Sequence, residues 1–182
     1  MRTVERPSSI EADSSSPYKL RRFREGDLTR VMEINRRCLP ENYTASFFLD
    51  LYNSYPETFL VAEYEGDVVG YVMCRLESGF SEFGRFKFVK KGHLVSLAVM
   101  HEHRDKGVGS RLLVAVMREM AKCGCRESFL EVRKSNSMAI ALYRKLGYEI
   151  ARCVKGYYLD GEAACVMCTK LPLIGSNKPG EN

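Results

Sequence analysis

The sequence lacks any apolar run as long as the roughly 20 residues that a helix needs to cross a bilayer. Its first stretch, "MRTVERPSSIEADSSSP", also lacks the apolar core of a secretory signal. These two absences argue against a membrane-spanning protein and against a secreted one. We therefore expect a cytoplasmic protein with no membrane partner.

The seven cysteines do not form the pattern of a disulfide framework. Their number is odd, and most of them lie inside apolar runs, as reduced and buried thiols do. The stretches "CGC" and "CVMC" raise the alternative of a zinc site. However, "CVMC" falls in an expected strand, where residues three apart face opposite sides. We expect no required metal.

Charge singles out no class of partner. The 28 Lys and Arg residues exceed the 23 Asp and Glu residues by five, without a long basic run. This excess permits a phosphate-bearing partner or a nucleic acid, and it equally fits a solvated basic surface.

Two common phosphate-binding motifs are absent. No Gly-x-x-x-x-Gly-Lys-Ser/Thr sequence is present, which excludes a P-loop. A dinucleotide-binding fingerprint would need a third glycine three residues after Gly109, where Leu112 stands.

The apolar content of 45% suits a globular protein, and 182 residues suffice for one domain with a full core. Residues 1–17 are polar, with a run of serines, and predict a disordered tail. Residues 173–182 predict a second, flexible tail. We expect a single domain over residues 18–172.

Hydrophobic periodicity predicts the elements of that domain. Strands are expected at 18–24, 58–64, 68–76, 92–100 and 127–133. The second and third form a hairpin through Glu65-Gly66-Asp67, and a closing hairpin over 149–171 turns at Asp160-Gly161. Helices are expected at 25–40 with Asp27 as N-cap, at 41–56, from the glycine turn to about 122, and at 135–148 with Gly147 at its C′ position. Residues 77–91 predict a loop. The order β-α-α-β-β-β-α-β-α-β-β indicates a mixed sheet with helices on its faces.

The stretch "RDKGVGS", Arg104 to Ser110, places two glycines between a buried strand and a helix. Such a turn presents backbone N–H groups, and the helix N-terminus adds partial positive charge, so that the pair favours an anion. Glycine allows phosphates to approach closely. A plain strand-to-helix connection is the simpler alternative.

Two stretches together resemble the GNAT superfamily of N-acetyltransferases. "RDKGVG" is similar to its Arg/Gln-x-x-Gly-x-Gly/Ala turn, and "NSMAIALYRKLGY" to its Asn-x-x-Ala-x-x-Leu-Tyr helix. Further stretches, "CLPENY", "GHLVSLAV", "LEVRKSN" and "KGYYLDGEAA", resemble protein N-terminal acetyltransferases, in particular archaeal relatives of the NatA catalytic subunit. The resemblance covers residues 18–171.

The resemblance implies an α/β (α+β) fold: a mixed, mostly antiparallel sheet of about seven strands with a splayed central pair and four flanking helices. It implies transfer of an acetyl group from acetyl-coenzyme A to the free α-amine of proteins or nascent peptides, by direct attack. It also implies a monomer that can associate with ribosomes and binds no specific nucleic acid. The alternatives are acetylation of lysine side chains or small amines, and a non-enzymatic nucleic-acid-binding module.

The resemblance also assigns roles to residues of this sequence. Catalysis would use Tyr143 as the acid that protonates the departing thiolate and, as the base, either Glu41 or a relay through His93 and Glu131. Glu131 departs from relatives that act on methionine-starting chains, some of which carry histidine there. The simpler interpretations are that Tyr143 is a core residue, that Glu41 is a loop carboxylate, and that His93 and Glu131 only satisfy each other's hydrogen bonds.

The coenzyme would be held by the end of the central strand, the glycine turn and the last helix: Leu97, Ala98, Val99, Arg104, Asp105, Lys106, Gly107, Val108, Gly109, Ser110, Asn136 and Tyr143. Asn136 could instead be a helix cap. The acceptor peptide would lie between two walls formed by Leu39, Pro40, Glu41, Tyr43, Leu97, Tyr157 and Tyr158. The two tyrosines could instead be ordinary strand residues.

Overall fold

The computed structural model describes residues 16–84 and 86–172. The expected tails therefore lie outside the described residues, apart from Ser16 and Pro17. The chain divides into two compact units, one made of Met1–Cys74 and Ser96–Val116, the other of Arg75–Val95 and Met117–Asn182. Within the described residues, no helix is both long and apolar enough to span a membrane.

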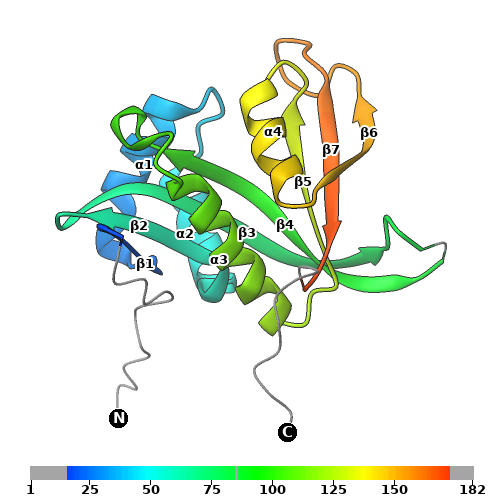
Figure 1. Cartoon of the computed structure of the whole chain (residues 1–182), viewed down its shortest axis with the longest axis horizontal. Helices are drawn as coiled ribbons and strands as arrows, with labels where there is room; N and C mark the ends of the chain where they lie inside the picture. The colour runs from blue at the N-terminus through cyan, green and yellow to red at the C-terminus, as the bar shows by residue number, and fades with distance from the viewer. Residues whose placement is uncertain (1–15, 85, 173–182) are drawn as a thin grey trace, which may run out of the picture. The chain divides into compact units, whose positions relative to one another are not determined.

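In the described part of the chain, seven strands and four α-helices follow one another in the predicted order, which confirms the α/β fold class (Figure 1). The strands are β1 (Tyr18–Arg22), β2 (Phe59–Tyr64), β3 (Asp67–Phe80), β4 (Phe88–Val99), β5 (Glu127–Arg133), β6 (Glu149–Val154) and β7 (Ala164–Lys170). The helices are α1 (Leu28–Cys38), α2 (Ala45–Ser54), α3 (Val108–Lys122) and α4 (Ser137–Lys145). The hydrogen-bonded strand order is β1-β2-β3-β4-β5-β7-β6.

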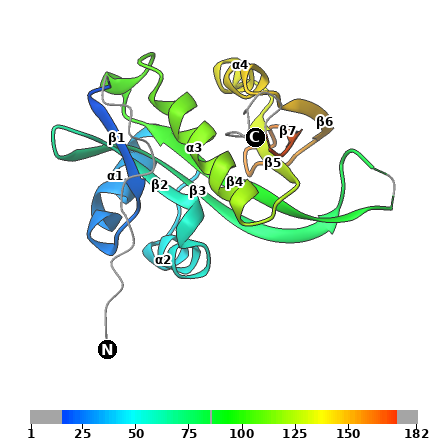
Figure 2. The same cartoon turned by 60° about the horizontal axis from the view of Figure 1, so that its bottom comes forward.

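In the first unit, β1 pairs antiparallel with β2, and β2 with β3. The β2–β3 hairpin closes through Glu65 and Gly66, whose φ angles of 49° and 86° suit the right-handed twist of a hairpin. Figure 2 shows α1 and α2 on one face of these strands and the start of α3 on the other. The strand residues between these helices, Phe59 to Ala62, are fully buried.

Helix α1 begins after Asp27, as predicted, but Asp27 does not cap it through its side chain. The carboxylate instead accepts hydrogen bonds from the Arg24 N–H at 2.8 Å and from the Arg21 guanidinium at 2.7 and 2.9 Å. The predicted N-cap position is confirmed, but a strand arginine binds the carboxylate, so that Asp27 caps α1 without a side-chain hydrogen bond. Helix α2 does carry a side-chain cap, in which Thr44 Oγ1 accepts from the Phe47 N–H.

In the second unit, β5 pairs antiparallel with β7, and β7 with β6. The parallel ladder between β4 and β5 covers only Lys91–His93 and Glu127–Phe129, although both strands continue beyond it. Helix α4 ends at Gly147, whose φ of 86° and N–H bond to the Arg144 carbonyl match the predicted C′ position.

The prediction of a loop over 77–91 was wrong at both ends. Strand β3 continues to Phe80, and β4 already begins at Phe88. The sequence hid these strand ends because Phe80 and Phe88 are exposed, 66% and 64%, and the surrounding residues do not alternate cleanly. The aromatic rings of these two residues meet edge to face at 5.6 Å.

Candidate active site

The glycine turn has the conformation that an anion site at a helix N-terminus needs. Gly107 has a φ of 77°, which L-residues rarely adopt, and its carbonyl accepts the Arg111 N–H at 3.0 Å as α3 begins. Nothing lies within 4 Å of the position that a Cβ at Gly107 would take. The first N–H groups of α3, from Val108, Gly109 and Ser110, have no partner within the helix. These groups can hold a diphosphate.

Asp105 is a second left-handed residue in this turn, with a φ of 58°. Aspartate tolerates this conformation better than most residues, because its short side chain can hydrogen-bond locally. The sequence analysis singled out the glycines and missed this feature, although an aspartate before a glycine in a turn was the available signal.

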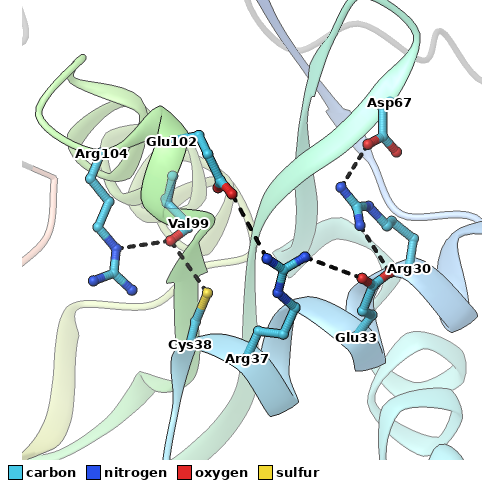
Figure 3. A network of polar contacts seen from close by, with 8 residues as sticks. All are labelled: Arg30, Glu33, Arg37, Cys38, Asp67, Val99, Glu102 and Arg104. Atoms are coloured by element: carbon cyan, nitrogen blue, oxygen red, sulfur yellow. Dashed lines mark hydrogen bonds and ion pairs between the residues drawn. The ribbon is translucent and has the colours of Figure 1, made fainter.

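Arg104 is held by the end of β4 in the first unit, as Figure 3 shows. Its Nε donates to the Val99 carbonyl at 3.0 Å, and the Cys38 thiol donates to the same oxygen at 3.5 Å. The Val99 carbonyl is thus already bonded within the chain, and backbone contacts of Leu97, Ala98 and Val99 with the coenzyme stay a prediction.

Ion pairs along α1 surround this contact (Figure 3). Arg30 binds Glu33 at 2.8 Å and Asp67 at 2.6 Å, while Arg37 reaches Glu33 at 3.4 Å and Glu102 at 3.8 Å. These pairs are largely solvated and contribute little individually. They nevertheless give the start of β3 and the residues after β4 a common set of charged contacts with α1.

The segment between α1 and α2 carries the predicted peptide-binding residues Leu39, Pro40, Glu41 and Tyr43. The Tyr43 ring stacks on Phe47 at 4.6 Å and meets the edge of Phe48 at 6.1 Å. The side chain of Asn35 bonds to the Glu41 carbonyl and to the Tyr43 N–H. Leu97, from β4, lies in the same unit.

In the second unit, His93 and Glu131 form the pair that the sequence predicted. His93 Nε2 lies 2.6 Å from Glu131 Oε2, and the His93 ring stacks on Phe129 at 4.4 Å with an interplanar angle of 5°. An ionised carboxylate only accepts, so Nε2 of a neutral His93 carries the proton and Nδ1 keeps the lone pair. Nδ1 is buried without a hydrogen-bond partner among the described residues. The lone pair of a neutral His93 therefore lies on the buried Nδ1.

The hydrogen bond from His93 keeps Glu131 ionised. Burial alone would raise the pKa of Glu131, but this hydrogen bond, with the nearby positive charge of Arg75, lowers it below its ordinary value. Burial and the Glu131 charge in turn raise the pKa of Tyr157, so its phenol remains a hydrogen-bond donor. His93, Glu131 and Tyr157 thus interact within one unit. Arg75, the first charged residue after the apolar part of β3, was missed by the sequence analysis.

The residues predicted on α4 occupy its two ends. Asn136 caps the helix, since its Oδ1 accepts the Ala139 N–H at 3.1 Å, which confirms the capping alternative. A second role toward the coenzyme remains a prediction. Tyr143 is buried, 9% exposed, with its ring 5.8 Å from that of Tyr148.

Tyr157 and Tyr158 lie in the connection between β6 and β7 rather than in a strand, so the alternative of ordinary strand residues was wrong. Arg133 holds this connection: its guanidinium lies 4.0 Å from the centre of the Tyr158 ring and binds Asp160 and Glu162 at 2.7 Å. Tyr157 is half exposed and meets Tyr158 edge to face at 5.1 Å.

The cysteines of the described segments are all free thiols. Cys153 and Cys165 are register partners on β6 and β7. Among residues 16–84 and 86–172, no group of three or more His, Cys, Asp or Glu side chains could hold a metal ion.

Comparison with known proteins identifies the fold. Residues 28–148, well over half of the chain, match the model of the acetyltransferase (GNAT) family. The chain belongs to this family. The matched segment of this GNAT chain begins with α1 and includes both the glycine turn and α4, which confirms the resemblance on which the site was predicted.

Relatives of this GNAT chain include N-terminal acetyltransferases. The N-alpha-acetyltransferase of Sulfurisphaera tokodaii is 44% identical over 163 residues, which cover 88% of this chain and 98% of that protein. The catalytic subunit NAA10 of the N-terminal acetyltransferase A complex of Arabidopsis thaliana is 38% identical over 148 residues, which cover 80% of this chain and 73% of that protein. The structure of Arabidopsis thaliana Naa50 in complex with the bisubstrate analogue CoA-Ac-MVNAL is similar, with a TM-score of 0.73 and 26% sequence identity. The match covers 85% of this chain and 99% of the Naa50 chain.

Proposed function

We propose that this chain is an N-alpha-acetyltransferase, which transfers the acetyl group of acetyl-coenzyme A to the free α-amine of protein N-termini. The observation that carries the proposal is the 44% identity to a named N-alpha-acetyltransferase over 98% of that relative's length. The conformation at Gly107 supports it, because an open, left-handed turn at the start of α3 suits the diphosphate of the coenzyme. Naa50, solved with an analogue that joins CoA to a peptide, supports the same pair of substrates.

The reaction needs orientation and a modest base. An α-amine has a pKa of about 7.7–8.0, so a sizeable fraction is neutral at physiological pH. The amine nitrogen attacks the thioester carbonyl and loses a proton, the C–S bond breaks, and the departing thiolate gains a proton from Tyr143. The products are the N-acetylated peptide and free coenzyme A.

Two groups can take the proton of the amine, Glu41 in the first unit and the His93–Glu131 pair in the second. The pair has the better-defined acceptor, His93 Nδ1, because Glu131 fixes the tautomer through Nε2. Glu41 keeps its proposed role beside Leu39, Pro40 and Tyr43 on the peptide side. The variants Glu41→Gln, His93→Gln and Glu131→Gln, each measured across pH, assign the base.

The wider setting belongs to the same proposal. The free thiols of the described residues fit a reducing compartment such as the cytoplasm. We expect a monomer that meets nascent chains near the ribosome, needs no metal and does not read nucleic-acid sequence. Size-exclusion chromatography and co-sedimentation with ribosomes test these expectations.

The deciding experiment compares acceptors at constant acetyl-coenzyme A. One peptide is offered with a free N-terminus, with a blocked N-terminus, and with a blocked N-terminus plus an internal lysine. Acetylation of the free N-terminus alone is expected. Equal rates on the first two peptides would reject the proposal, and a preference for the lysine peptide would favour the alternative acceptor, which the names of the relatives do not support.

A further inference from the structure

Asn35 is a polar side chain in the buried face of α1. It is 1% exposed and lies beside Ile34 and one turn from Val31, both fully buried. Burying a carboxamide costs free energy unless its groups find hydrogen-bond partners. The partners of Asn35 therefore show what this residue holds in place.

Asn35 bonds to every second residue of the segment that follows α1. Its backbone carbonyl accepts the Leu39 N–H at 3.0 Å. Its Nδ2 donates to the Glu41 carbonyl at 3.1 Å, and its Oδ1 accepts the Tyr43 N–H at 3.2 Å. Three bonds from one residue define the path of the backbone from Leu39 to Tyr43.

The second N–H of the same amide continues the network toward β4. Nδ2 donates to the Tyr71 hydroxyl at 3.0 Å, and this hydroxyl shares a hydrogen bond with Ser96 Oγ at 2.8 Å. Burial raises the pKa of Tyr71 well above its ordinary value, so the hydroxyl stays protonated. Both N–H groups and the carbonyl of the amide are now engaged, which allows only one orientation of the side chain.

We propose that Asn35 is a positioning residue, which fixes the segment 39–43 relative to the end of β4 through Tyr71 and Ser96. The inference rests on the proposed function, in which this segment contacts the acceptor peptide and the strand residues after Ser96 align the coenzyme. All members of the network belong to the first unit. Asn35 thereby places the backbone that carries Glu41 and Tyr43 in register with the backbone of Leu97.

A purely structural role makes a different prediction. Loss of a buried hydrogen bond would then lower the melting temperature and leave the kinetic constants of the folded enzyme unchanged. Thr58 offers a matched control in the same unit, because it is fully buried and its Oγ1 bonds to the Tyr55 and Cys74 carbonyls at 3.3 and 3.1 Å rather than to the segment 39–43. Thr58→Val removes these bonds and keeps the shape of the side chain.

The test measures wild type, Asn35→Ala, Tyr71→Phe and Thr58→Val with a free-amine peptide and with acetyl-coenzyme A. We expect Asn35→Ala to lower kcat/KM for the peptide about tenfold to a hundredfold, and Tyr71→Phe about threefold, since each leaves buried polar groups unpaired. The Kd for acetyl-coenzyme A, measured by calorimetry, should stay within about twofold of wild type. Thr58→Val should lose stability without a change in peptide kinetics.

Each outcome decides the inference. The inference is overturned if Asn35→Ala and Tyr71→Phe have the same kcat/KM for the peptide as Thr58→Val. It is also overturned if kcat/KM for the peptide and the affinity for acetyl-coenzyme A fall by the same factor. If Asn35→Ala does not fold, Tyr71→Phe against Thr58→Val decides alone. An inactive wild type would instead reject the proposed function, and with it the role of Asn35 in that reaction, so the two failures are distinguishable.

Discussion

Replacing Gly107 by alanine tests the coenzyme site most directly. At a φ of 77° an L-residue is strained by about 1–2 kcal/mol, and the reduced freedom of the unfolded chain returns about 0.4–1 kcal/mol. We therefore expect Gly107→Ala to destabilise the fold by about 1 kcal/mol, or about 2–4 °C in Tm for a chain of this size. The added methyl group meets no protein atom within 4 Å, so the protein itself adds no clash.

In the proposed coenzyme site, the same methyl group would stand where the diphosphate approaches. Loss of one charge-assisted hydrogen bond is worth about 1.5–3 kcal/mol, which weakens acetyl-coenzyme A binding about tenfold to a hundredfold. Isothermal titration calorimetry measures this change, and thermal unfolding measures the strain separately.

Gly124 provides the control for this experiment. It has a φ of 86° and equally open surroundings, and it lies between α3 and β5, away from the glycine turn. Gly124→Ala should lose the same stability and keep the wild-type affinity for acetyl-coenzyme A. Equal affinity of the two variants would refute the assignment of the turn to the coenzyme.

Three further substitutions test the remaining site. Glu131→Gln keeps the shape of the side chain but removes its charge, and should slow peptide acetylation about tenfold to a hundredfold at unchanged coenzyme affinity, as measured by initial rates. Because the pKa of Glu131 lies below its ordinary 4.5, its ionised form stabilises the fold above that pH, and the advantage over Glu131→Gln disappears as pH falls through the folded-state value. Asn136→Ala should lower stability by about 1 kcal/mol in urea unfolding, because the cap on the Ala139 N–H is lost. Tyr143→Phe should lower kcat about tenfold or more, as measured by saturation kinetics, because the thiolate loses its proton donor.

Each of these expectations has an outcome that contradicts it. The urea midpoints of wild type and Glu131→Gln should differ more at pH 7 than at pH 3. An equal difference at the two pH values would show that the charge of Glu131 does not act on stability. An unchanged midpoint for Asn136→Ala would remove the capping role. A full rate for Tyr143→Phe at saturating substrates would mean that the thiolate obtains its proton elsewhere.

Local patterns predicted the elements that depend on neighbouring residues. Glu65-Gly66 stands between two apolar runs and forms the tight hairpin turn, because only a short turn with two positive φ angles matches the twist of the strands. Gly147 ends α4 for a similar local reason, since a residue without a Cβ adopts the left-handed conformation at little cost. At Gly66 and Gly147 the residue type specifies the backbone conformation, whereas Glu65 adopts its positive φ because the turn requires it.

Features that depend on distant partners escaped prediction. Asp27 is of a residue type that often caps helices through its side chain, yet Arg21 from β1 binds its carboxylate. No local pattern singled out Asn35, because its partner Tyr71 lies 36 residues further along the chain, and Ser96, which bonds to Tyr71, lies 61 residues further. A single sequence gives no signal for such pairings.

The site residues also divide into those that a local pattern indicates and those that depend on distant partners. The left-handed conformation at Gly107 was predictable, because a glycine between a strand and a helix indicates a turn that other residues rarely adopt, whereas the coenzyme contacts of this turn stay a prediction. The partnership of His93 and Glu131 followed from placing both in adjacent strands, and the parallel ladder from Lys91 to His93 confirms that placement. Arg75 and Arg133 act through space on Glu131 and Tyr158, and no local pattern distinguishes them from surface arginines.

The face-to-face packing of His93 on Phe129 makes the His93–Glu131 pair visible to spectroscopy. A phenyl ring stacked 4.4 Å from an imidazole, nearly parallel to it, shields the imidazole protons and shifts their resonances upfield. The chain has three histidines, so few ring signals compete in a proton spectrum. Nitrogen-15 labelling of histidine would then report which ring nitrogen carries the proton, and how that changes when a peptide amine arrives, without any substitution in the protein.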